Sequence, residues 1–138
     1  MSEHFDMLEA RDPAERERGL MARLPAQVAH ARARCPHFAE TLAGVDADAV
    51  DSRAALAKLP VVRKHQLLAL QKQRPPLGGL AATPLAGLAH VFSSPGPIAD
   101  PEGRGEDWWR WARAMHAAGI RAGDLVHNTF SYHFTPAG

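Results

Sequence analysis

The fold class of this chain depends on one stretch, HVFSSPGPIADPEGR, residues 90–104. The apolar residues in LAHVFSS (88–94) predict a strand, and the strand runs into a loop of serines, prolines and glycines. A strand that ends in two serines and a glycine-containing loop is where many nucleotide-binding proteins hold a phosphate. The loop is therefore either a phosphate-binding loop, an altered form of one, or only a turn.

The residues of this loop offer an incomplete set of phosphate ligands. Ser93 and Ser94 supply hydroxyl groups, and Gly96 lets the backbone approach a ligand closely. Pro95 and Pro97 each remove a backbone N–H donor, and the loop contains no lysine. From the chemistry alone, we expect a rigid turn rather than a competent phosphate loop.

The residues after the loop predict an α/β fold. GEDWWRWARAMHAAG (105–119) has the pattern of a helix, and a Gly-Asp turn then leads into a second apolar strand at 125–130. Strand, helix and strand in this order predict the first βαβ unit of a larger, mostly parallel sheet. Two strands do not make a stable sheet, so we expect further strands beyond Gly138 and a chain that is truncated.

The residues before the loop predict a helical region. Asp12 and Pro13 are typical of a helix start, and we expect a helix over 12–35 that kinks or breaks at Pro25. Further helices are expected over 36–44, after a cap at Ser52, and over 62–71. RPPLGG (74–79) is the clearest linker. We therefore expect two parts: residues 1–78, a helical accessory region, and residues 79–138, the beginning of an α/β domain.

Composition excludes several classes of protein. The 138 residues are 46% hydrophobic and 22% charged, as in a globular domain, and the net charge is +1 with basic and acidic residues interleaved. We therefore expect no nucleic acid partner. No apolar run approaches the roughly 20 residues of a membrane span, and no leader is recognisable, so we expect no membrane partner and a cytoplasmic protein. The single cysteine, Cys35, excludes an internal disulfide and is expected to be a small buried residue.

The sequence contains three other candidate sites, formed by the histidines, the tryptophans and the aromatic tail, and each has a simpler structural explanation. The histidines lack the spacing of metal ligands, so we expect no metal site and place at the surface or its boundary His30, His37, His65, His90 and His116. Trp108, Trp109 and Trp111 could form an aromatic platform for a ligand, but their helical spacing favours Trp108 and Trp111 packing under a sheet, with Trp109 at the margin. The aromatic residues of the tail 129–138 fit a ligand site and a cover for the sheet edge equally well.

Several stretches in order resemble the N-terminal part of phenylacetate-CoA ligase and its relatives in the adenylate-forming superfamily. The stretches that carry the resemblance are CPHFAETLAGV (35–45), LPVVRKHQLLAL (59–70), RPPLGGLAAT (74–83), HVFSSPGP (90–97) and WWRWARAMHAAGIRAGDLVHNTFSYHFTPAG (108–138). The resemblance implies an acid–thiol ligase that activates an aromatic, phenylacetate-like carboxylic acid. ATP and Mg²⁺ would serve to form an acyl-adenylate, and coenzyme A would accept the acyl group. It also implies a small-molecule acid as partner and, because such relatives are commonly dimeric, a homodimer.

The resemblance also implies roles for particular residues. Ser93 and Ser94 match the first two serines of the family's phosphate loop, and residues 95–99 stand where Gly, Thr, Thr, Gly and Lys are expected. The loop, with Gly96 in it, is thus a degenerate nucleotide phosphate loop. The substrate pocket would receive three residues of the tail: Tyr132, His133 and Phe134.

The family's metal-binding acidic residue, ribose-binding aspartate and catalytic lysine have no counterpart in the chain. We therefore expect no catalytic residue in it, no activity of the 138 residues alone, and no tight binding of ATP, Mg²⁺ or coenzyme A by them. The alternative is a non-catalytic paralogue that keeps the fold as a ligand-binding or interaction protein.

Overall fold

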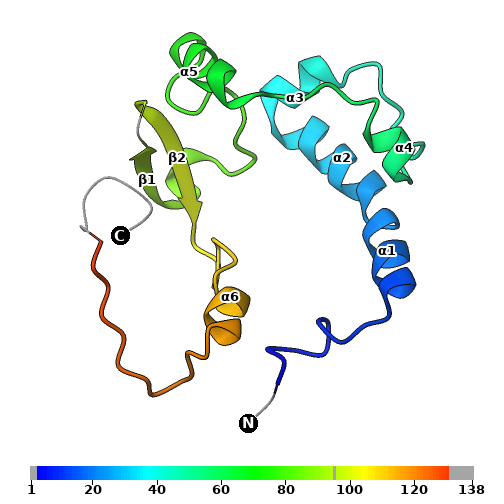
Figure 1. The fold of residues 1–138 in the computed structure, drawn as a ribbon. Helices are drawn as coiled ribbons and strands as arrows, with labels where there is room; N and C mark the ends of the chain where they lie inside the picture. The colour runs from blue at the N-terminus through cyan, green and yellow to red at the C-terminus, as the bar shows by residue number, and fades with distance from the viewer. Residues whose placement is uncertain (1–2, 95, 131–138) are drawn as a thin grey trace.

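The structure, a computed structural model, describes residues 3–94 and 96–130. Figure 1 shows an α-helical half followed by a β-hairpin and a last short helix. The elements in order are α1 (Pro13–Met21), α2 (Leu24–Arg34), α3 (Pro36–Thr41), α4 (Arg53–Leu56), α5 (Lys64–Gln73), the 3₁₀ turn η1 (Leu85–Gly87), β1 (Leu88–Ser94), β2 (Ile98–Gly103) and α6 (Ala112–Ala117).

The helical region begins as its sequence predicts. The Asp12 carboxylate accepts hydrogen bonds from the backbone N–H groups of Ala14 (2.9 Å) and Glu15 (3.0 Å), so it caps α1. The expected break in the long helix is also present: α1 ends at Met21, and Pro25 lies in the first turn of α2. Proline suits this position because the first N–H groups of a helix have no partner within it.

A small hydrophobic core holds the helices together. Val28 of α2, Leu42 and Val50 are its buried members, with Phe38, Val45, Ala47, Ala55 and Leu59 packed around them. The Arg32 guanidinium ties α2 to the following loop by donating to the carbonyl of Val45 at 2.6 Å. This core lies in the helical half, away from the hairpin.

The expected linker at 74–79 is an ordered turn. Leu77 and Gly78 are buried, and the backbone N–H of His37 donates to the carbonyl of Gly79 at 3.0 Å. Gly78 has a φ of +68°, and a Cβ added there would lie 3.1 Å from the carbonyl carbon of Leu70. Glycine is therefore required both by the backbone conformation and by the close approach to α5. The division of the chain at residue 78 stays a prediction.

The helices-then-strands organisation of the expected α/β chain is confirmed, but the pairing of the strands differs from the βαβ expectation. β1 pairs antiparallel with β2, with Ser94 opposite Ile98 and Leu88 opposite Gly103. Within the described part of the chain, residues 125–130 form no strand. The sequence misleads because Asp100, Pro101 and Gly103 are typical of loops, yet here they form an edge strand opposite an apolar one.

The helix expected over 105–119 is much shorter than its pattern predicts. Only α6, Ala112–Ala117, is helical, because Asp107 and Arg110 have positive φ values of 47° and 60°. These values are incompatible with a right-handed helix. The tryptophan-rich segment before α6 folds back onto the hairpin instead.

Figure 1 shows α1, α2, α3 and α4 on one side of the chain and the hairpin and α6 on the other, with α5 next to the hairpin. The N-terminal segment reaches α6: Arg113 bonds to the Asp6 carboxylate, and the rings of Phe5 and His116 meet edge to face with centroids 5.9 Å apart. The surface area is 10219 Å², whereas a compact protein of this mass exposes about 7,000 Å². Much of the apolar surface of this chain is therefore left uncovered.

Candidate functional site

The expected phosphate-loop position forms the tip of the β1–β2 hairpin. Ser94 ends β1, Ile98 begins β2, and residues 95–97 connect them. Gly96 has a φ of +103°, a conformation that favours glycine, and the Ser94 hydroxyl donates weakly to the carbonyl of Ile98 at 3.4 Å. The hairpin thus brings Ser93, Ser94 and Gly96 together in one tight turn, while Pro95 lies outside the described residues.

The surroundings of the loop add little that could hold a phosphate. The next helix, α6, begins only at Ala112, so the loop does not lead directly into a helix N-terminus. Arg104, the nearest downstream cation, follows the far end of β2. At about 3.3 Å per residue it lies on the order of 20 Å from the turn. The described residues therefore offer a phosphate one free hydroxyl at Ser93 and the backbone around Gly96.

The other expected site residues cannot be placed. Tyr132, His133 and Phe134 lie outside the described residues. Their expected role in a substrate pocket stays a prediction.

The hairpin carries a polar and aromatic cluster that sequence reasoning misses. His90 and Glu102 are opposite each other in the hairpin register, and His90 Nδ1 is bonded to Glu102 Oε2. The indole N–H of Trp109 donates to Glu102 Oε1 at 2.9 Å, and its ring lies 6.4 Å from that of Phe92. Only the pairing of 88–94 with 98–103 places His90 opposite Glu102. Local sequence patterns do not predict that pairing.

The electrostatics of this cluster favour an ionised Glu102. The hydrogen bond from His90, and a second one from Trp109, lower the pKa of the Glu102 carboxyl below its ordinary value. Both carboxylate oxygens of Glu102 already have partners, and the imidazole of His90 is largely exposed. The cluster therefore fastens the tryptophan segment to the hairpin and presents one imidazole to solvent.

Two of the three tryptophans pack against the hairpin: Trp108, as the sequence favours, and Trp109, which the sequence places at the margin. Trp108 covers Gly103, where an added Cβ would lie 2.3 Å from its ring, while the ring of Trp109 lies against Phe92. Trp111 is 59% exposed, so the expectation that it packs under a sheet is wrong for the described chain. The contacts come from a turn rather than from one face of a helix, since the segment is not helical.

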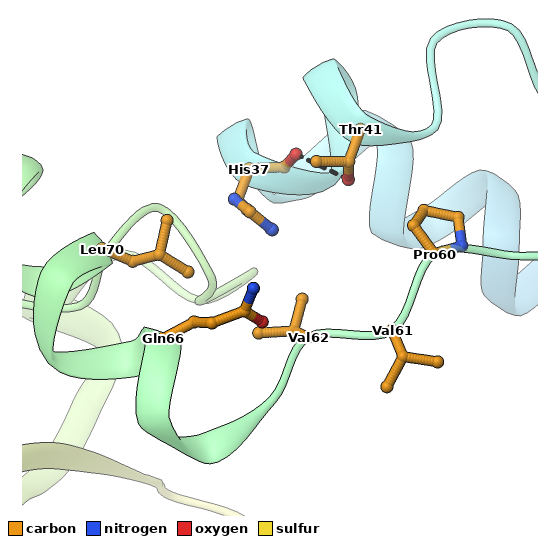
Figure 2. A pocket seen from close by; sticks show the side chains of 7 residues that line it. All are labelled: His37, Thr41, Pro60, Val61, Val62, Gln66 and Leu70. Atoms are coloured by element: carbon orange, nitrogen blue, oxygen red, sulfur yellow. Dashed lines mark hydrogen bonds between the residues drawn. The ribbon is translucent and has the colours of Figure 1, made fainter.

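A second candidate site is a cleft of about 220 Å³ between α3, α5 and the segment that joins α4 to α5. Figure 2 shows its lining: His37, Thr41, Pro60, Val61, Val62, Gln66 and Leu70. Its polar groups are used within the chain, because the Thr41 hydroxyl donates to the carbonyl of His37 at 3.0 Å and Gln66 Oε1 accepts from the backbone N–H of Arg63 at 2.7 Å. The free polar groups in the cleft are therefore the imidazole of His37 and the amide NH₂ of Gln66.

Three further features of the described residues concern a free thiol, metal binding and membrane spans. Cys35 is a buried free thiol, as expected, and burial raises its pKa. Among residues 3–94 and 96–130, no group of three or more His, Cys, Asp or Glu side chains could hold a metal ion. In the same residues no helix is long and apolar enough to cross a membrane.

Comparisons with known proteins give a consistent result. No family model matches the chain. A phenylacetate-coenzyme A ligase from Aromatoleum evansii is 34% identical over 121 residues, which make up 81% of this chain and 26% of that ligase. The chain thus spans about a quarter of the length of this relative.

Solved structures of 2-hydroxyisobutyryl-CoA ligase share the fold. One, in the postadenylation state in complex with R3-HIB-AMP, has a TM-score of 0.76 and 30% identity, covering 86% of this chain and 26% of that one. Another, in complex with 2-HIB-AMP and CoA in the thioesterification state, has a TM-score of 0.73 and 29% identity, covering 86% and 27%.

In sequence and in fold, the chain is therefore similar to acyl-CoA ligases over most of its length. The expected resemblance to phenylacetate-CoA ligase in particular is confirmed.

Proposed function

We propose that the chain is the N-terminal part of an ATP-dependent acyl-CoA ligase that activates an aromatic, phenylacetate-like acid through an acyl-adenylate. The observation that carries the proposal is the similarity over more than four fifths of the chain to a phenylacetate-coenzyme A ligase. The solved relatives bind an acyl-AMP and coenzyme A, which supports the same two-step chemistry. ATP, Mg²⁺ and coenzyme A would be the cofactors of the whole ligase, which we place in the cytoplasm as a homodimer.

The described residues fit this role only in part. The hairpin tip supports a phosphate-loop position, with the Ser93 hydroxyl and the Gly96 backbone as the groups that would contact a phosphate. The donor set lacks a cation, and Ser94 already donates within the turn. The described residues do not form a Mg²⁺ site, so the metal and the catalytic groups would come from other parts of the ligase. By itself, the chain is proposed to be inactive.

One observation favours a second function, that of a non-catalytic paralogue that binds a ligand or a partner. Pro97, at the hairpin tip, has no N–H to offer, and neither has Pro95. A ligase whose phosphate loop has lost these donors would hold ATP weakly. The fold could then persist because it still binds the acid.

Pyrophosphate release decides between the two functions. The protein is expressed from a reading frame that includes residues 1–138 and continues past codon 138, and it is purified. Pyrophosphate release is then measured with ATP, Mg²⁺ and a panel of aryl acids. The ligase proposal predicts release that requires both ATP and an aryl acid. Absence of release with every acid, together with a raised melting temperature with one of them, would establish the binding protein instead.

A further inference from the structure

The side chain of Gln71 in α5 is hydrogen-bonded to the backbone of the hairpin close to its turn. Gln71 of α5 accepts a hydrogen bond from the backbone N–H of Ala99 through Oε1 at 2.8 Å. Its Nε2 donates to the carbonyl of the same residue at 2.8 Å. In an antiparallel pair the N–H and C=O of one residue point the same way. Both groups of Ala99 therefore face away from β1, and Gln71 occupies the place of a neighbouring strand.

The contact between Gln71 and Ala99 lies next to the hairpin turn. Ala99 follows Ile98, the first residue of β2, and pairs with Ser93 across the hairpin. The side chain of Ile98 is buried, at 7% exposure, in a cleft of about 160 Å³ that Gln71, Leu67 and Leu77 also line. The downstream end of the turn is thus held by an apolar contact and by two backbone hydrogen bonds.

The charge-neutral amide of Gln71 suits this task better than any charged group. Its NH₂ group donates and its oxygen accepts in one plane, which matches the C=O acceptor and the N–H donor of Ala99. The two groups of Ala99 are part-buried, so leaving them without partners would cost free energy. Loss of the amide therefore frees the turn from α5.

From this geometry we infer that Gln71 is a positioning residue: it sets the orientation of the Ser93–Pro97 turn relative to α5 and couples the turn to the helical region. The inference rests on the proposed function for the importance of the turn, since there the turn would meet the nucleotide phosphates. In this protein the turn would take its orientation from a preceding helix rather than from a helix that follows it.

The test is amide hydrogen exchange of the 138-residue chain, followed by NMR at pH 4 and pH 7 and expressed as protection relative to an unstructured peptide. Gln71→Leu should lower protection at Ala99 about tenfold at both pH values. The helical core around Leu42 should keep its protection. A uniform loss over the helices would instead show a general stabilising role and would overturn the inference.

Gln71→Glu gives a sharper readout, because a protonated carboxyl keeps one donor and one acceptor whereas a carboxylate only accepts. At pH 7 the ionised Glu can still accept from the N–H of Ala99 but cannot donate to its carbonyl, which repels it, so the contact loses one of its two hydrogen bonds. At pH 4 most of a Glu with the ordinary pKa of about 4.3 is protonated and can keep both bonds. Relative to the unaltered chain, protection at Ala99 should therefore be lower at pH 7 than at pH 4.

Gln73→Glu is the matched control, since it places the same group on the exposed end of the same helix. It should leave Ala99 unchanged at both pH values. Equal protection of Ala99 in the Gln71→Glu chain and the unaltered chain at pH 7 would overturn the inference. The exchange experiment contains no nucleotide, so its result does not depend on the proposed function. The pyrophosphate assay tests that function separately.

Discussion

His90 and Glu102 are bonded side chain to side chain across the β1–β2 hairpin, and Glu102 uses its second oxygen to hold the indole of Trp109. The carboxylate form of Glu102 is stabilised by both bonds, which lower its pKa. A group with a lowered folded pKa contributes stability above its unfolded value of about 4.3, and the contribution disappears as pH falls through the folded pKa.

We therefore expect the contact between Trp109 and the hairpin to weaken in acid. Tryptophan fluorescence should change below about pH 4 in the unaltered chain. Glu102→Gln should show a flatter profile, with the altered signal already present at neutral pH. Glu106→Gln, an exposed neighbour, is the control. Identical acid profiles for all three chains would contradict the role assigned to Glu102.

Gly103 is required by the ring that covers it. An added Cβ would lie 2.3 Å from Trp108 Cζ3, so Gly103→Ala must displace the ring. Because Trp108 is 43% exposed and can move, we expect a modest loss of about 1 kcal/mol in stability. The fluorescence maximum should shift to the red.

Gly105→Ala is the matched control for this substitution. Its Cβ would meet the same ring at an ordinary distance of 3.9 Å. A chain with Ala at 103 that keeps the emission of the unaltered chain would show that Trp108 does not cover this glycine.

Substitution of Leu42 tests how much the helical core stabilises the chain. It is 5% exposed and packs with Val28 and Val50. Truncation of a buried leucine removes apolar contacts and leaves a cavity, so Leu42→Ala should cost about 2–5 kcal/mol in urea unfolding followed by circular dichroism. Leu56→Ala, at a position that is 40% exposed, should cost much less. Equal losses would mean that the core lies elsewhere.

The hairpin tip should not bind ATP in the 138-residue chain. Its prolines lack N–H groups, and residues 93–99 contain no lysine or arginine. We expect the melting temperature to be the same with ATP, with adenosine and with buffer. A clear shift with ATP alone would show that the prolines do not disable the loop.

In the whole ligase that we propose, Pro95→Gly and Pro97→Thr together are expected to strengthen ATP binding. Each substitution returns a backbone N–H to the turn, and Thr adds a hydroxyl. The Michaelis constant for ATP in the pyrophosphate assay measures the effect. An unchanged constant would mean that the loop never limits ATP binding.

The helical region could be predicted from sequence because local signals decide it. Asp12 caps α1, Pro25 lies in the first turn of α2, and Ser52 caps α4 by accepting from the N–H of Ala55 at 3.3 Å. Each signal acts within a few residues of itself, so no knowledge of the tertiary structure is needed.

The hairpin and the tryptophan segment could not be predicted in the same way. β2 contains Asp100 and Pro101, which local patterns assign to a loop, and it becomes a strand because β1 lies on one side and Gln71 on the other. The expected helix starts late because Trp108 and Trp109 gain contacts with the hairpin that helical backbone would not allow. For the candidate site, the hairpin holds Ser93, Ser94 and Gly96 close together, but their contact with a phosphate stays a prediction. The partners of Glu102 depend on a register that only the fold reveals.

Residues 125–130 have a practical consequence for anyone who prepares this chain. Leu125 is fully exposed, Val126 and Phe130 are more than half exposed, and the segment has no strand partner in the described residues. Exposed, unpaired segments with high β-propensity recruit copies of themselves into aggregates. Storage concentration will therefore limit every solution experiment on the chain, and a lysine at position 126 is the simplest way to raise that limit.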